Sequence, residues 1–132
     1  MADTPHRVLV ADDDGGIRFI WRNALLKPAG AYEVVTVCDG CQALDEITRA
    51  PFDLVVTDIR MPRMSGVELT EALRELGYRI TVIWITARGV PRMAEEAERL
   101  GVYCCFYKPL CVDRMRQIVA DALADSPKEA RP

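Results

Sequence analysis

Residues 52–66 read Phe-Asp-Leu-Val-Val-Thr-Asp-Ile-Arg-Met-Pro-Arg-Met-Ser-Gly, and this stretch decides the fold. Leu54, Val55 and Val56 form an unbroken apolar run, which is typical of a parallel strand covered on both faces. Asp58 ends that run. A carboxylate there is costly unless it points out of the carboxyl edge of the sheet, where ligands bind in open α/β sheets. We therefore expect Asp58 at a ligand-binding edge rather than in an ordinary surface turn.

A helix is predicted to begin directly after this stretch. Ser65 is a favourable N-cap residue, and Glu68 three residues later completes a capping box. Gly77 is the expected C-terminal stop. The apolar stripe between these signals consists of Leu69, Ala72, Leu73 and Leu76.

The rest of the chain alternates strand and helix patterns in the same way. Further strands are expected at residues 8–11, 33–37 (at a sheet edge), 80–85 and 103–107. The first helix is expected to end near Pro28. The apolar stripes of the other helices are Ile17, Ile20, Trp21 and Ala24; Leu44 and Ile47; Met93, Ala97 and Leu100; and Val112, Met115, Val119 and Ala122. Five alternating strands and helices predict βαβ units and a parallel sheet, with the strand order still open.

Length and composition point to one globular domain over residues 1–132, and the polar residues 125–132 are expected to be a tail or linker stub. The chain is 50% hydrophobic and 28% charged, and its net charge is -3. This charge argues against direct nucleic-acid binding, because no basic stripe is present to neutralise phosphates. The start of the sequence lacks the apolar core of a signal peptide, and no apolar run approaches a membrane span. We expect a soluble, cytoplasmic protein.

The five cysteines are expected to be reduced thiols. Cys38 and Cys41 have the C-x-x-C spacing of redox and zinc motifs. The simpler interpretation, which we favour, is that both pack as small hydrophobic residues where a strand passes into a helix. Cys104 and Cys105 are adjacent, so their side chains should point to opposite faces of a strand.

Polar residues follow four of the predicted strands: Asp12 and Asp13, Asp58, Thr86, and Lys108. In a parallel sheet these strand ends lie on one edge. Two carboxylates 4 Å apart repel by roughly 4 kcal/mol at an effective dielectric constant of about 20, so a cation must complete the site. Lys108 supplies one positive charge, and all-oxygen ligands favour Mg²⁺ over zinc. A carboxylate can act as a nucleophile and form an acyl phosphate, so this set suits phosphoryl transfer.

The sequence closely resembles the receiver domain of two-component response regulators. The resemblance covers residues 7 to about 124, and its motifs are highly specific. The matching residues are Val8-Leu9-Val10-Ala11-Asp12-Asp13-Asp14, Asp58 with Met61-Pro62 and Ser65-Gly66, Ile85-Thr86-Ala87, and Lys108-Pro109. The resemblance implies a flavodoxin-like (βα)5 fold, a three-layer sandwich with a parallel sheet in the order 2-1-3-4-5. On that order, the two cysteine pairs lie on opposite sheet edges and cannot share a metal.

The resemblance also implies a role for each site residue. Asp58 would accept a phosphoryl group from a sensor histidine kinase or phosphotransfer protein in a Mg²⁺-dependent reaction. The other implied roles are direct metal binding by Asp13 and Asp58, metal binding mostly through water by Asp12, a backbone carbonyl ligand from Arg60, phosphoryl contacts from Thr86 and Lys108, and a cis peptide bond at Lys108-Pro109.

Phosphorylation would then bias a two-state surface on the fourth helix, fifth strand and fifth helix, which signals to an output protein or domain. The resemblance implies neither membrane nor direct nucleic-acid binding, and a homodimer is compatible with it. Assistance of its own phosphorylation and dephosphorylation would be the only catalysis.

Two departures from the family pattern stand out. Cys105 replaces the usual Tyr or Phe three residues before the lysine, so we expect altered coupling to the output surface. Arg60 and Arg88 flank the site, and we expect them to change the lifetime of the phosphorylated state. Three other interpretations are disfavoured. A constitutive pseudo-receiver would lack one of the acidic-pocket residues, and all of them are present. An aspartyl phosphohydrolase usually has a second Asp two residues after the first, and position 60 is Arg. A C-x-x-C redox protein is disfavoured because no further motif supports it.

Overall fold

The computed structural model describes residues 5–26, 31–87 and 90–125. Strands and helices alternate along these segments, as the sequence predicted. In chain order they are β1 (His6–Ala11), α1 (Gly15–Leu25), β2 (Tyr32–Val37), α2 (Gly40–Arg49), β3 (Leu54–Thr57), α3 (Gly66–Glu75), β4 (Thr81–Thr86), α4 (Met93–Leu100), β5 (Cys104–Tyr107) and α5 (Val112–Asp125). The described helices include none long and apolar enough to cross a membrane.

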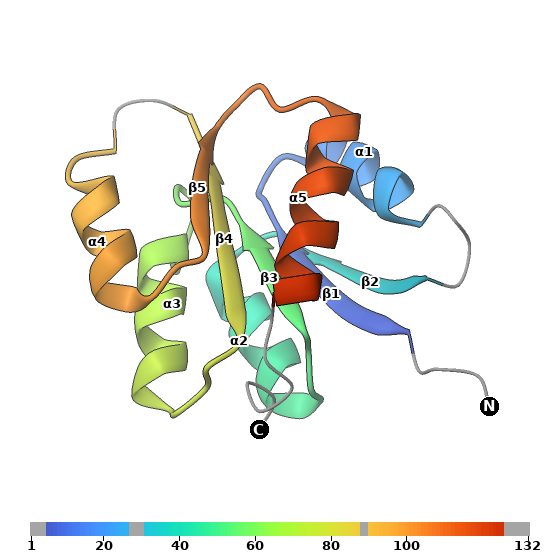
Figure 1. Ribbon diagram of the computed structural model, residues 1–132. Coiled ribbons are helices and arrows are strands. Elements are labelled where there is room, and N and C mark those ends of the chain that lie inside the picture. Colours follow the sequence, from blue (N-terminus) through green and yellow to red (C-terminus); the bar gives the residue numbers. More distant parts are fainter. Residues whose placement is uncertain (1–4, 27–30, 88–89, 126–132) are drawn as a thin grey trace.

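All five strands pair in parallel, in the order β2-β1-β3-β4-β5 (Figure 1). This order confirms the predicted flavodoxin-like fold and places β2 at the sheet edge. Helices α1 and α5 cover one face of the sheet, and α2, α3 and α4 cover the other (Figure 1). Three layers result. Because every strand runs the same way, all five carboxyl ends lie along one edge.

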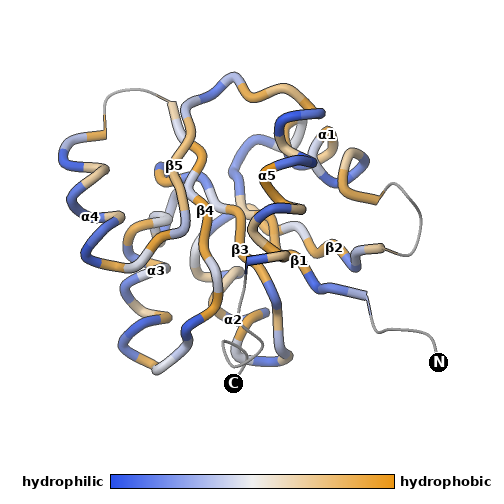
Figure 2. The backbone as a smooth tube through the Cα atoms, viewed as in Figure 1, coloured by the Kyte–Doolittle hydropathy of each residue, from blue (hydrophilic) through white to orange (hydrophobic). Residues whose placement is uncertain are grey.

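Successive side chains along each strand point to opposite faces of the sheet, so two hydrophobic cores form. Leu54 and Val56 of β3 pack towards α1 and α5, whereas Val55 between them packs towards α2 and α3. All three are fully buried. Figure 2 shows this pattern as apolar tubes through the middle of the sheet, with hydrophilic segments concentrated on the outer helices. The uninterrupted apolar run at the start of the motif is therefore explained by helices on both faces.

The structure corrects some details of the predicted helices. Ile20 is 51% exposed, because it lies about 100° around α1 from the buried Trp21, and Leu25 completes the buried stripe instead. Leu76 is 60% exposed because α3 has already ended, and it occupies the C-cap ahead of Gly77 at φ 90°. The predicted end of α1 near Pro28 lies outside the described residues.

Gly66 holds the start of α3 against the end of β3. Its amide donates to the carbonyl oxygen of Ile59 at 2.8 Å. A Cβ atom at this position would overlap the backbone oxygen of Asp58. The capping box predicted at Ser65 and Glu68 is present and begins the helix at the same point. Glycine is therefore required here by a close backbone approach, and the position of Asp58 depends on it.

Replacing Gly66 with alanine should lower the free energy of unfolding by about 1–3 kcal/mol, because the new methyl group must push against backbone. Urea denaturation followed by circular dichroism measures this change. Gly15→Ala is the matched control, since a Cβ there meets only the flexible end of Arg18 at 3.4 Å. The control should be within about 0.5 kcal/mol of the wild type or slightly more stable. Equal stabilities for the two variants would contradict the close approach at Gly66.

Candidate functional site

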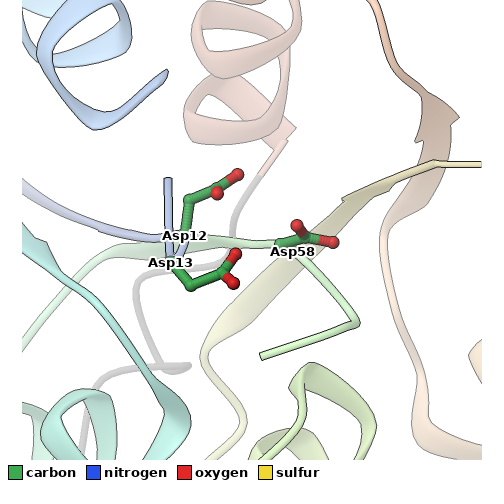
Figure 3. A group of neighbouring side chains, drawn as sticks. All are labelled: Asp12, Asp13 and Asp58. Atoms are coloured by element: carbon green, nitrogen blue, oxygen red, sulfur yellow. The ribbon is translucent and has the colours of Figure 1, made fainter. Parts of the chain in front are cut away.

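Three aspartates gather at the carboxyl edge of the sheet (Figure 3). Ala11 and Thr57 are register partners in the neighbouring strands β1 and β3, so the next residues, Asp12 and Asp58, emerge side by side. One carboxylate oxygen from each of Asp12, Asp13 and Asp58 lies within 4.8 Å of the others. Asp12 is fully buried, Asp58 is 6% exposed, and Asp13 is exposed. The site thus has two buried charges and one open to solvent.

Lys108 supplies one positive charge to the two buried carboxylates. Its Nζ atom donates to Oδ2 of Asp12 and to Oδ2 of Asp58, at 2.8 Å in each case. Its own amide donates to the carbonyl oxygen of Thr86 at 2.8 Å, which fixes the backbone from which the side chain starts. Lys108 follows β5, so its side chain reaches past β4 to the ends of β3 and β1. Only a long cationic side chain spans that distance.

Burial and charge oppose each other at these groups. Burial lowers the pKa of Lys108, but the hydrogen bonds and charges of Asp12 and Asp58 outweigh it and leave that pKa raised. Burial raises the pKa of Asp12, and the Lys108 ammonium and the Asp14 amide only partly offset this effect. Burial therefore disfavours the charged form of Asp12 in the folded protein.

The third aspartate after β1 serves a different purpose. Asp14 is the N-cap of α1, and its Oδ1 atom accepts from the amides of Gly16 and Ile17 at 2.8 and 3.1 Å. The Asp14 amide in turn donates to Oδ1 of Asp12 at 2.9 Å. The Asp12-Asp13-Asp14 run thus supplies two site carboxylates and one helix cap, and the amide of the cap residue holds the Asp12 carboxylate.

Thr86 contributes a hydroxyl to the same edge. It is fully buried at the end of β4, and its Oγ1 is a buried polar atom without a hydrogen-bond partner among the described residues. Such an atom is costly unless something else satisfies it. The implied cis peptide bond at Lys108-Pro109 is present.

Arg60 contacts the phosphoacceptor candidate through its backbone. Its amide lies 3.3 Å from Oδ1 of Asp58. A cleft of about 690 Å³ runs past this point, with Asp13, Arg60 and Pro91 among its lining residues. Arg88, the other predicted flanking arginine, lies outside the described residues.

The cysteines do not gather into one site. Cys38 lies after the end of β2, with its Sγ atom 3.2 Å from Oε1 of Gln42, but Cys41 is exposed rather than packed as predicted. Cys104 and Cys105 point to opposite faces of β5, as expected, and pack into the two different cores. The metal-ligating groups found among the described residues include no cysteine.

Two features of the site's surroundings were not predicted. Trp84 of β4 is the register partner of Cys105, and its fully buried indole donates to Oγ1 of Thr70 at 3.0 Å. A large ring therefore lies beside the small thiol. Tyr103, which directly precedes β5, donates from its hydroxyl to Asp125 at the end of α5. Register and side-chain direction decide these contacts, and sequence spacing alone did not reveal them.

Comparisons with known proteins agree with this geometry. A family model described as the response regulator receiver domain matches residues 8–120. Sporulation initiation phosphotransferase F of Bacillus subtilis is 34% identical over 113 residues, which cover 86% of this chain and 90% of that protein. Sensor protein EvgS of Escherichia coli K12 is 33% identical over 83% of this chain, and transcriptional regulatory protein GlrR of the same strain is 32% identical over 96%. The matched regions are only 9% and 28% of those two longer proteins.

Solved structures show the same architecture. A CheY-like receiver domain protein from Methanospirillum hungatei JF-1 superposes with a TM-score of 0.86 and 25% identity, over 95% of this chain and 98% of that one. Chemotaxis response regulator CheY4 of Vibrio cholerae gives a TM-score of 0.79 and 30% identity, over 90% of this chain and 99% of that one.

Removal of the Lys108 charge should destabilise the fold. Lys108→Met leaves buried carboxylates facing each other, so the free energy of unfolding at neutral pH should fall by about 2–3 kcal/mol. This deficit should shrink as the pH is lowered, because Asp12, whose pKa is already raised, then takes up a proton. Urea denaturation across pH measures both effects. Adding Asp12→Asn should restore most of the loss, and Arg79→Met, at an exposed position, is the control. A Lys108→Met variant as stable as the control would contradict the account.

Proposed function

This chain is a member of the response regulator receiver domain family, and on that basis we propose that Asp58 accepts a phosphoryl group in a Mg²⁺-dependent reaction. Receiver domains are phosphoacceptor signalling domains. The observation that carries the assignment is the convergence of Asp12, Asp13 and Asp58 around Lys108. Of the two carboxylates that contact Lys108, Asp58 is the one with some exposure to solvent.

The proposed step is a displacement at phosphorus. A carboxylate oxygen of Asp58 forms a bond to the phosphorus atom, the bond to the donor's imidazole nitrogen breaks, and that nitrogen keeps the electron pair. Lys108 is already hydrogen-bonded to Asp58, so its ammonium is placed to neutralise charge on the transferred group. The Thr86 hydroxyl would donate to a phosphoryl oxygen, which would give its buried Oγ1 atom a hydrogen-bond partner. Thr86 and Lys108 thus assist only the domain's own phosphorylation and dephosphorylation.

The donor set fits a hard divalent cation. Three carboxylates converge, and the cleft beside Asp13 gives room for the water molecules that Mg²⁺ retains. Asp13 and Asp58 would bind the ion directly, Asp12 mostly through water, and Arg60 through its backbone carbonyl. The bound ion would neutralise carboxylate and phosphoryl charge during transfer.

A docking place for the phosphodonor lies beside Lys108. A hollow of about 460 Å³ is lined mainly by apolar residues of α1 and of the segment after β5, including Ile17, Trp21 and Leu110. Ile20 also lines the hollow and is 51% exposed, and Phe19, its neighbour in the chain, is 69% exposed. A histidine kinase or phosphotransfer protein that presents apolar side chains here would bring its phosphohistidine to the Asp58 edge. The proposed output surface consists of α4, β5 and α5, and its strand β5 is the sheet edge opposite β2.

We further propose that residues 1–132 contain a single receiver domain, with its core at about 7–124 and residues 125–132 as a tail or linker stub. The family match over residues 8–120 supports the core boundaries. GlrR and EvgS carry the matched region within longer chains. The matches are therefore consistent with a signal passed to another domain of the same chain and with a signal passed to a separate protein.

Incubation with Mg²⁺ and acetyl phosphate should add one phosphoryl group, and Asp58→Asn should abolish the addition because the nucleophilic oxygen is lost. Intact-mass spectrometry measures the product.

Asp13→Ala should prevent Mg²⁺-dependent labelling, whereas Cys38→Ser, outside the site, should label normally. The rate at which the phosphoryl group is lost should differ between Arg60→Asn and the wild type if Arg60 affects the lifetime of the phosphorylated state. Equal rates would rule out this effect of Arg60. Equal labelling of Asp58→Asn and wild type would refute the assignment, and no labelling of either by any donor would favour a constitutive binding module.

A further inference from the structure

The loop between β3 and α3, residues 59–65, carries part of the phosphorylation site. Its two ends are tied together by the hydrogen bond from the Gly66 amide to the carbonyl oxygen of Ile59. Directly after Asp58, the Arg60 amide faces the Asp58 carboxylate at 3.3 Å. The path of this loop therefore sets how backbone groups are presented to the phosphoacceptor.

The far side of the loop is fastened to the start of α2. Arg63 Nε donates to Oδ2 of Asp39 at 2.8 Å, and its Nη2 atom contacts the same oxygen. The Gly40 amide donates to the carbonyl oxygen of Met64 at 3.0 Å. A Cβ atom on Gly40 would overlap the Met64 backbone, so the two segments are in close contact. Loop and helix are thus joined by an ion pair and a backbone hydrogen bond.

Both carboxylate oxygens of Asp39 accept hydrogen bonds. Oδ1 caps α2 by accepting from the Gln42 amide at 2.8 Å, and Oδ2 accepts from Arg63. The carboxylate is fully buried, whereas most of the Arg63 side chain is exposed. The Cys38 thiol, 3.8 Å from Oδ2, is only a weak donor. The Gln42 amide, followed by Arg63, outweighs burial and lowers the pKa of Asp39.

Arg63 makes this contact from an unusual backbone conformation. Its φ is 64°, in the left-handed region that residues other than glycine rarely adopt. Such conformations persist where surrounding contacts hold them. Arg92 at φ 58° is the other non-glycine example among the described residues, but its partner Glu95 is exposed. Arg63 is therefore held at a strained position by a buried carboxylate.

We propose that the Arg63–Asp39 ion pair is a positioning element for the phosphorylation site. It holds the loop after β3 at a fixed place relative to α2, so that the backbone of Arg60 is presented to Asp58 and to a bound metal ion. Arg63 does not touch the reacting atoms in this scheme. The inference rests on the proposed function, because Mg²⁺ is taken as the ligand of the site.

Arg63→Gly tests the proposal, because glycine tolerates the backbone conformation and removes only the side chain. The apparent dissociation constant for Mg²⁺, measured by tryptophan fluorescence, should rise about three- to tenfold, below the 10- to 100-fold typical of groups that directly support a metal ligand. Amide hydrogen exchange in residues 59–66 should become faster without metal. The midpoint of urea unfolding should change little, because relief of backbone strain offsets loss of the pair.

Two further variants sharpen the test. Arg63→Lys keeps the charge and should recover most of the Mg²⁺ affinity. Asp39→Asn keeps the oxygen that caps α2 but should lower the Mg²⁺ affinity as much as Arg63→Gly does. Arg92→Gly is the matched control: it relieves the same kind of strain and breaks an exposed ion pair, so affinity should not change. Unchanged affinity and exchange in Arg63→Gly would overturn the proposal. If wild type bound no Mg²⁺, the proposed function would fail instead, and exchange in residues 59–66 would still decide whether Arg63 holds the loop.

Discussion

Lys108 holds together a group of charges that would otherwise repel one another. Its ammonium lies 2.8 Å from a buried oxygen of Asp12 and from one of Asp58, two carboxylates that adjacent strands force side by side. Burial alone would favour the neutral forms of Asp12 and Lys108. The hydrogen bonds and mutual charges are sufficient to keep the pKa of Lys108 raised, yet the pKa of Asp12 remains raised too. The site is therefore incompletely neutralised, which suits the divalent cation and the phosphoryl group that we propose it accepts.

The rest of the fold serves this arrangement. Parallel strands bring the ends of β1, β3, β4 and β5 to one edge. The order β2-β1-β3-β4-β5 puts the acidic residues next to each other, with Lys108 two strands from Asp58 and three from Asp12. Gly66 allows α3 to begin in contact with the Asp58 backbone. Asp14 caps α1, and its amide donates to the Asp12 carboxylate. Packing on both faces of the sheet then keeps the strand ends in register.

Much of this was accessible from the sequence because strand ends in a parallel sheet share an edge. Asp12, Asp13, Asp58, Thr86 and Lys108 could each be placed by the apolar run before it, and the family resemblance supplied the strand order. The exposure of Ile20 and Leu76 was missed, because helical periodicity does not show where a helix meets its neighbour or stops. The Arg63–Asp39 pair and the Trp84–Cys105 neighbours were also missed. They depend on a left-handed backbone conformation and on strand register, which leave no local signal in composition.

Nitrogen-15 NMR titration of the Lys108 ammonium tests the central claim most directly. The chain has three lysines, so the signal can be assigned by its loss in Lys108→Met. Without metal, Lys108 should titrate above its ordinary pKa of 10.5, because both carboxylates favour the charged form. Asp12→Asn should move that pKa downwards by removing one of the two partners. A Lys108 that titrates at or below 10.5 in the wild type would show that burial dominates and that the carboxylates are not held by this residue.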